Sequence, residues 1–183
     1  MKALSARPYT SRVAYLFCSY KSQTDQSALS LLAALLKQLV RNRPEIATPV
    51  TQIHKLHSKR GSKPSFSDIL QALQSVLSAY TTIFIAVDTL DECSNRDGAR
   101  GQLIDKLNEL QTRQDIRLLF TSRFIPEITR KFQSKSTLEV RASEEDVKRF
   151  VAGQIPCLPG CIQRDEDLKL AVQNKVVEAL DGM

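Results

Sequence analysis

Short apolar runs alternate with longer segments, in which apolar residues recur three and four positions apart, along the first three quarters of the chain. Residues 82–87 form a continuous run rich in β-branched and aromatic side chains, and the run ends at Asp88. A run without polar alternation predicts a parallel strand that is buried on both faces. Residues 13–20 and 115–123 form similar runs, and residues 136–141 predict a fourth, shorter strand.

Three amphipathic helices are predicted between these strands. Their apolar residues recur three and four positions apart in segments that run from residue 27 to about 43, from 66 to 80 and from 99 to about 112. Ser65 and Asp68 are spaced as in a capping box at the start of the second helix. Strands that alternate with helices are typical of parallel βαβ units, so the pattern predicts an α/β fold with a parallel sheet.

The remaining segments are less regular. Residues 44–64 are rich in turn formers and predict a long connection with a short helix near residues 49–57. After residue 143 two amphipathic helices follow each other with no strand between them, which predicts a separate or attached helical region. The expected organisation is a polar N-terminal segment (1–12), an α/β core (13–142) and the start of a helical region (143–183).

Composition favours an ordinary soluble domain. The 183 residues are 42% hydrophobic and 25% charged. No apolar run approaches the ~20 residues that cross a bilayer, and the N-terminus has no apolar signal-peptide region. Four cysteines in a chain of this length do not form a disulfide framework, so we expect reduced thiols and a cytoplasmic location. Cys18 and Cys93 fall in or beside apolar strands and are predicted to be core or near-core thiols.

The net charge of +6 is concentrated between Arg41 and Lys63. No aromatic residue lies among the cations of this stretch, so a solvated connection is favoured over a nucleic-acid surface. The two histidines and the two C-terminal cysteines could in principle bind zinc, but their spacing matches no known zinc finger.

Carboxylates follow the strand at 82–87 directly. Asp88 ends the run, and Asp91 and Glu92 come within the next turn. Open α/β sheets bind ligands at the carboxyl ends of their strands, where these acids are expected to lie. Arg123 ends the next predicted strand, and a guanidinium beside the acids could pair with phosphate oxygens. The alternative is a buried strand followed by a solvated acidic turn.

Together these segments resemble the NACHT domain of STAND-type P-loop NTPases, in the fungal version that is similar to the N-terminal region of nephrocystin-3. Four segments carry the resemblance: the strand at 13–20, the leucine-rich helix at 27–39, the acid-tipped strand at 83–93 and Leu-Leu-Phe-Thr-Ser-Arg at 118–123. The resemblance implies a three-layer, P-loop NTPase-like α/β fold with a parallel sheet, followed by a small helical region.

The resemblance also implies roles for individual residues. Asp88 corresponds to the Walker B acid that holds Mg²⁺, and Asp91 and Glu92 correspond to the acids that orient or deprotonate the attacking water. Thr121 and Arg123 correspond to sensor 1, whose arginine senses the γ-phosphate of the nucleotide.

One motif of this family is missing from the sequence. A P-loop requires Gly-x₄-Gly-Lys-Ser/Thr, whose main-chain N–H groups and lysine cradle the phosphates, and none of the six glycines lies in such a motif. We therefore expect a core without the P-loop strand, in either a gene fragment or a degenerate copy. The missing strand is expected to pair beside the strand at 82–87, so its loss would leave main-chain groups and apolar side chains uncovered.

Three functions are compatible with these observations. The first is part of a NACHT-type nucleotidase whose longer parent would use Mg-ATP or Mg-GTP, while this chain holds no cofactor and neither binds nor hydrolyses nucleotide appreciably. The second is a non-enzymatic protein-interaction scaffold. The third, least favoured, is a basic nucleic-acid-binding domain. Protein partners or self-association are expected, and membrane contact is not.

Overall fold

The structure, a computed structural model, describes four stretches of the chain: residues 9–23, 25–95, 98–141 and 143–181. Most of the polar segment predicted for residues 1–12 lies outside the described residues. The chain divides into two compact units, residues 1–133 and residues 134–183. Each unit is described by itself.

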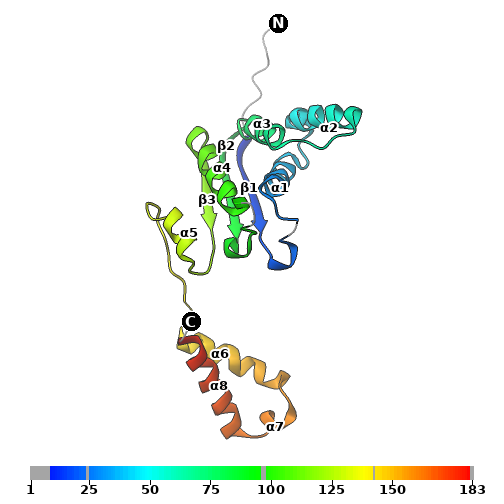
Figure 1. Cartoon of the computed structure of the whole chain (residues 1–183). Coiled ribbons are helices and arrows are strands. Elements are labelled where there is room, and N and C mark those ends of the chain that lie inside the picture. Colours follow the sequence, from blue (N-terminus) through cyan, green and yellow to red (C-terminus); the bar gives the residue numbers. More distant parts are fainter. Residues whose placement is uncertain (1–8, 24, 96–97, 142, 182–183) are drawn as a thin grey trace. The chain divides into compact units, whose positions relative to one another are not determined.

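The first unit is built on a three-stranded parallel sheet (Figure 1). Its strands, in their spatial order, are β1 (Tyr9–Phe17), β2 (Tyr80–Asp88) and β3 (Ile116–Phe120). Phe17 pairs with Asp88, and Val87 pairs with Phe120, so the three strands end at the same edge of the sheet. The predicted α/β fold with a parallel sheet is confirmed.

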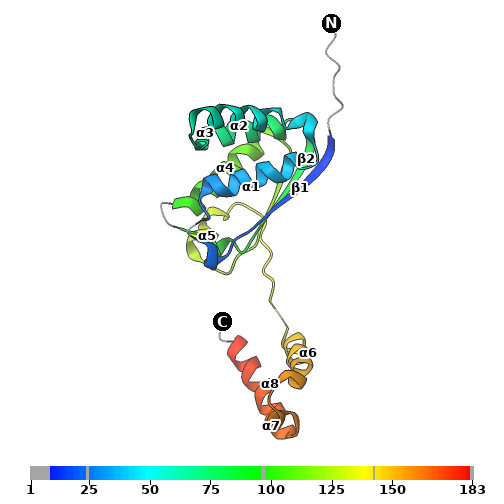
Figure 2. The same cartoon turned by 90° about the vertical axis from the view of Figure 1, so that its right-hand side faces the viewer.

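Three helices pack on one face of this sheet (Figure 2). They are α1 (Ala28–Val40), α3 (Phe66–Leu77) and α4 (Ala99–Arg113), each predicted from its apolar period. Ser65 and Asp68 form the predicted capping box of α3, in which each side chain accepts the main-chain N–H of the other residue. The apolar side chains of the three helices and of alternate strand residues form one buried core. Burial of each large side chain contributes about 1.5–3 kcal/mol.

The first unit also contains two further helices and three 3-10 turns among its described residues. They are the helices α2 (Thr48–Arg60) and α5 (Pro126–Lys131) and the 3-10 turns η1 (Tyr20–Ser22), η2 (Pro44–Ile46) and η3 (Leu90–Glu92). Helix α2 fills most of the segment that was predicted to be a connection with a short helix. Gly61 ends it in the left-handed conformation, at φ 61°, and donates its N–H to the His57 carbonyl.

The face of the sheet opposite the helices carries exposed apolar side chains, so the prediction of a strand buried on both faces is wrong. Ile83 and Ile85 of β2 are each 1% exposed, whereas Phe84 between them is 42% exposed. Its apolar neighbours on this face are 53–67% exposed. We call Phe84 and these neighbours the open face: Val13, Tyr15, Phe17, Phe84 and Leu119. The physical reason is that α1, α3 and α4 all cover the same side of the sheet, and successive strand residues point to opposite sides.

The two edges of β2 are both occupied, by β1 and by β3. This corrects the prediction that a missing strand would pair beside β2, because an added strand can pair only at an outer edge. Part of the outer edge of β1 is closed by a side chain. The amide of Gln38 accepts the N–H of Tyr15 at 3.0 Å and donates to the Tyr15 carbonyl at 2.7 Å.

The regular elements of the second unit are all helical among its described residues, and residues 136–141 form neither helix nor strand. The unit contains α6 (Glu144–Gln154), the 3-10 turn η5 (Ile155–Cys157), α7 (Gly160–Gln163) and α8 (Glu166–Asp181). Ser143 caps α6 by accepting the N–H of Asp146. The fourth strand predicted at 136–141 is not formed, and Leu138 and Val140 are each 84% exposed. An alternating pattern makes no stable strand unless a sheet edge is available to pair with it.

Among the helices of the described stretches, none has both the length and the apolar character that a bilayer crossing requires.

Candidate functional site

The segments that follow β2 and β3 are hydrogen-bonded to each other at the carboxyl edge of the sheet. The N–H of Thr121 donates to the Val87 carbonyl at 3.0 Å, and the N–H of Leu90 donates to the Thr121 carbonyl at 2.9 Å. These two bonds extend the parallel pairing beyond the last residue of β3. The acidic turn after β2 therefore lies beside the Thr-Ser-Arg segment after β3, as the sequence predicted.

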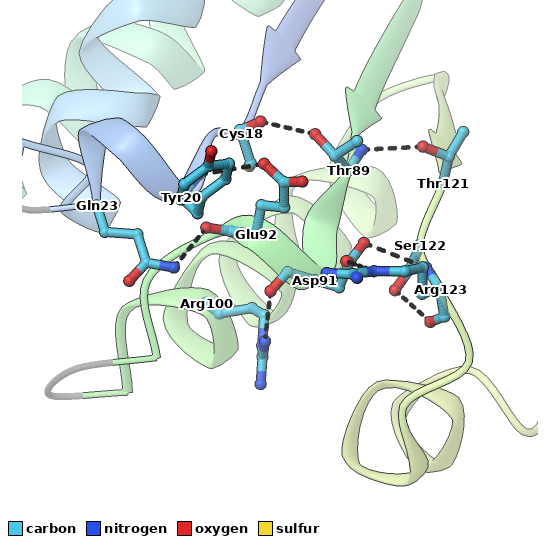
Figure 3. A network of polar contacts seen from close by, with 10 residues as sticks. All are labelled: Cys18, Tyr20, Gln23, Thr89, Asp91, Glu92, Arg100, Thr121, Ser122 and Arg123. Atoms are coloured by element: carbon cyan, nitrogen blue, oxygen red, sulfur yellow. Dashed lines mark hydrogen bonds and ion pairs between the residues drawn. The ribbon is translucent and has the colours of Figure 1, made fainter. Parts of the chain in front are cut away.

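Thr89 turns the chain from β2 into η3 in an uncommon conformation. Its φ of 52° and ψ of 48° are left-handed, a region that β-branched residues rarely adopt. Its N–H donates to Thr121 Oγ1 at 2.9 Å, and its hydroxyl donates to the Cys18 carbonyl at 2.7 Å (Figure 3). The Thr121 hydroxyl donates in turn to the carboxylate of Asp88. Hydrogen bonds thus connect this turn to the ends of both β1 and β3. Residues held in a rare backbone conformation, as Thr89 is, are concentrated at functional sites.

Asp91 and Arg123 form an ion pair across the same edge. The carboxylate of Asp91 accepts Arg123 Nε–H at 2.6 Å and the main-chain N–H of Arg123 at 3.1 Å (Figure 3). The Asp91 side chain is 3% exposed, whereas the Arg123 side chain is 79% exposed. Burial alone would raise the pKa of Asp91, but the hydrogen bonds from Arg123 outweigh it and hold this pKa below its usual value. The pair leaves Arg123 accessible to a ligand from solvent.

Glu92 contacts the segment that follows β1. Its carboxylate accepts the main-chain N–H of Tyr20 at 3.1 Å, and its carbonyl accepts the side-chain amide of Gln23, also at 3.1 Å (Figure 3). The turn η1, which follows β1, is thereby joined to η3. Asp91 and Glu92 are adjacent in sequence, yet they are held by different partners.

Arg100 is a member of this site that the sequence analysis missed. Its side chain is 9% exposed, and its guanidinium donates to the main-chain carbonyl of Asp91 at 3.4 Å and to Glu127 of α5 at 3.0 Å. Arg100 therefore holds the acidic turn against α4 and α5. A signal was present in the sequence, because Arg100 occupies the helical stripe that continues through Leu103, Ile104 and Leu107.

The acids at this edge could bind Mg²⁺ only if a ligand, such as a phosphate, supplied further oxygen atoms to the ion. Among the described residues, no group of three or more His, Cys, Asp or Glu side chains could hold a metal ion by itself. Mg²⁺ commonly uses one or two carboxylates and completes its shell with water and substrate phosphates. Asp88 fits that requirement, because the Thr121 hydroxyl orients its carboxylate without adding a charge. Asp91 does not fit it, because Arg123 already neutralises its buried carboxylate.

The structure therefore brings the five predicted site residues to one edge in three groups. Asp88 is bonded to Thr121, Asp91 is bonded to Arg123, and Glu92 is bonded to the main chain of Tyr20. Their catalytic, metal-binding and phosphate-sensing roles stay predictions.

A three-stranded parallel sheet with acids and an arginine at its carboxyl edge defines an α/β protein. The carboxyl ends of the strands are where open α/β sheets generally place ligands. Residues 2–123, well over half of the chain, match the family described as the N-terminal region of nephrocystin 3, and the chain belongs to this family. No curated protein matches the sequence.

Proposed function

We propose that this chain carries the magnesium and γ-phosphate side of a NACHT-type nucleotide site, in a module of a STAND signalling or receptor-like protein of the cytoplasm. The observation that carries the proposal is the convergence of Asp88, Asp91 and Arg123 on adjacent strand ends. Two charges of opposite sign, one oriented acid and one exposed guanidinium, suit a metal-bound phosphate.

Each residue has a separate task in this proposal. Asp88 would hold Mg²⁺ directly or through water, and the ion would neutralise the phosphate oxygens. Arg123 would contact the γ-phosphate through the terminal nitrogens of its exposed guanidinium, while Asp91 fixes the side chain through Nε. Glu92 would orient a water near the phosphate in the parent protein, once the hydrogen bond to Tyr20 is exchanged for one to that water.

The chain by itself is expected to be inactive. No segment of its sequence supplies the Gly-x₄-Gly-Lys-Ser/Thr loop that would cradle the β- and γ-phosphates. Without those N–H groups and that lysine, the acids of the turn repel the nucleotide. We expect the affinity for Mg-ATP and Mg-GTP to be weaker than about 0.1 mM, which corresponds to about −5.5 kcal/mol.

Calorimetric titration of the chain with Mg-ATP tests this expectation. The matching experiment uses a chain extended upstream in its own reading frame, if that frame encodes a Gly-x₄-Gly-Lys-Ser/Thr motif. The extended chain should bind Mg-ATP more tightly, and Asp88→Asn should weaken binding in Mg²⁺ much more than in EDTA. Asp105→Asn, which alters an exposed ion pair of α4 with Lys131, is the matched control. Equal affinities of the Asp88 and Asp105 variants would contradict the proposed role of Asp88.

A second candidate function is a non-enzymatic protein-interaction scaffold, favoured by the open face. Parallel sheets are ordinarily covered on both sides, so exposed Phe17, Phe84 and Leu119 suggest a surface that another protein covers. Sedimentation velocity over a range of concentrations tests this function through self-association. Phe17→Lys should reduce any association, whereas Lys37→Glu, on the exposed side of α1, should not. A Phe17→Lys variant that associates as strongly as the wild-type protein would argue against this surface.

A further inference from the structure

The connection between α2 and α3 holds a histidine between a serine and an aspartate. Helix α2 ends at Arg60, α3 begins at Phe66, and the two helices are in contact (Figure 2). His57 of α2 places Nδ1 2.8 Å from the hydroxyl oxygen of Ser62 and Nε2 3.1 Å from the carboxylate of Asp68. The His57 side chain is 13% exposed, whereas Ser62 is an exposed residue. The Ser62 hydroxyl therefore lies at the surface against a largely buried imidazole.

The charge of Asp68 fixes the direction of these hydrogen bonds. Ser65 donates its hydroxyl and its main-chain N–H to this carboxyl group, and these two bonds hold the pKa of Asp68 below its usual value. The carboxylate can only accept, so His57 Nε2 carries a hydrogen and donates it. In the neutral imidazole Nδ1 is then the acceptor of the Ser62 hydroxyl. An anionic group on Ser62 would instead accept from a protonated His57, which would bridge two anions.

Cations flank Ser62 on both sides in the sequence. Residues 46–67 contain no aspartate or glutamate. Their lysines and arginines are all exposed residues, namely Lys55, Lys59, Arg60 and Lys63. Charge complementarity selects partners of opposite sign, so this segment suits a protein whose binding groove is lined with carboxylates.

The structure distinguishes Ser62 from the other serines of this segment. Ser58 lies within α2, Ser67 lies within α3, and Ser65 belongs to the capping box of α3. Ser62 lies outside both helices, and its N–H makes one hydrogen bond, to the His57 carbonyl at 3.1 Å. An enzyme that binds an extended chain around its target hydroxyl breaks that single bond at Ser62. At the other serines it would have to unfold a helix or open the capping box.

We propose that Ser62 is a phosphorylation site for a serine kinase that binds basic peptides, and that the phosphate pairs with His57 and fixes α2 to α3. Three observations support this assignment: the exposure of Ser62, the cations on both sides of it, and the imidazole nitrogen 2.8 Å from the oxygen that would carry the phosphate. None of them depends on nucleotide binding at the strand ends.

The reaction transfers the γ-phosphoryl group of Mg-ATP held by the kinase. A bond forms between Ser62 Oγ and phosphorus, and the bond from phosphorus to the bridging oxygen of ADP breaks. The hydroxyl proton passes to the carboxylate base of the kinase, and ADP leaves. The phosphate carries a charge of about −1.5 to −2 at neutral pH. Protonated His57 donates to it through Nδ1, while Nε2 still donates to Asp68.

Peptide mapping of the kinase-treated protein tests the site. The whole chain is incubated with Mg-ATP and the catalytic subunit of cyclic-AMP-dependent protein kinase, which is directed by basic residues. We expect phosphate on Ser62, and Arg60→Ala should slow its incorporation at least about tenfold. Lys37→Ala, at an exposed position of α1, should not change the rate. Incorporation on Ser58, Ser65 or Ser67 in place of Ser62, or none in residues 58–67, would overturn the proposal.

Phosphorus-31 NMR tests the contact between the phosphate and His57. The second pKa of a phosphoserine is about 6. In the folded phosphoprotein it should be lower by at least about 0.5 than in the same protein unfolded in urea, because the imidazolium stabilises the dianion. His57→Gln should reduce this difference, whereas His54→Gln, at an exposed histidine of the same helix, should leave it unchanged. Equal pKa values in the folded and unfolded phosphoprotein, or equal effects of the two substitutions, would contradict the pairing.

Discussion

Asp91 and Arg123 are partners of very unequal exposure. The carboxylate is buried and receives two hydrogen bonds from one residue, while the guanidinium that neutralises it projects into solvent. Removal of the carboxylate and removal of the guanidinium should therefore affect stability differently. Loss of the carboxylate leaves a hydrated cation, but loss of the guanidinium leaves a buried anion.

Substitutions of this pair should have unequal effects on stability. Asp91→Asn should lower the free energy of unfolding by about 1–2 kcal/mol at neutral pH, because the hydrogen bonds weaken but no buried charge remains. Arg123→Ala should lower the free energy of unfolding more than Asp91→Asn does, because it leaves the buried carboxylate of Asp91 without its cation. Urea unfolding measures both. Asp105→Asn, at an exposed ion pair, should change stability by about 0.5 kcal/mol or less. The opposite ranking of Asp91→Asn and Arg123→Ala would contradict the buried-anion interpretation.

The same pair predicts a dependence of stability on pH. The pKa of Asp91 is lower in the folded protein than in the unfolded chain, where it is about 3.9. Its contribution is therefore fully present above that value and is lost as the pH falls through the lower folded pKa. The stability difference between wild type and Asp91→Asn should shrink over this acidic range. Urea midpoints measured from neutral to acidic pH would show it, and a constant difference would count against the depressed pKa.

Two substitutions of Thr89 separate the effect of backbone strain on stability from the effect of the hydroxyl group. Thr89→Gly removes a left-handed strain of about 1–2 kcal/mol and also loses the hydrogen bond to Cys18, worth about 1 kcal/mol. Thr89→Val keeps the strain and loses the bond. Thermal unfolding should therefore rank the glycine variant equal to or above wild type and the valine variant below both. If valine were as stable as glycine at this position, the turn would not be strained.

Gln38 protects the outer edge of β1. Gln38→Ala should leave the N–H and carbonyl of Tyr15 without this partner, with a loss of about 1–2 kcal/mol and stronger self-association through the freed edge. Lys37→Ala, the neighbouring exposed position, is the control. Urea unfolding and sedimentation velocity measure the two effects. A monomeric Gln38→Ala variant of unchanged stability would show that the side chain does not close this edge.

The periodic parts of the chain could be predicted because their signal is local. The apolar stripes of α1, α3 and α4 and the capping box at Ser65 depend on residues within a few turns of one another. The adjacency of the acidic turn and Arg123 also followed, since parallel strands end at one edge of a sheet.

The remaining features depend on contacts that no local pattern encodes. An apolar run does not say which side of a sheet the helices will cover, so the exposure of Phe84 was missed. Gln38 bonds main-chain atoms of a residue far away in sequence, and any polar side chain could have done so. The prediction of a fourth strand was wrong for the same reason. Leu138 and Val140 alternate with polar residues as in a strand, but their segment pairs with no strand among the described residues.

The most direct test of the central proposal is an NMR titration of the ¹⁵N-labelled chain with Mg-ATP up to about 10 mM, a range suited to weak binding. We predict progressive shifts of the amides of Thr89, Thr121 and Arg123, with a dissociation constant weaker than about 0.1 mM and with loss of the shifts in Arg123→Ala. Shifts that cluster elsewhere on the fold, or no shifts at this edge at the highest concentration, would contradict the claim that these strand ends form half of a nucleotide site.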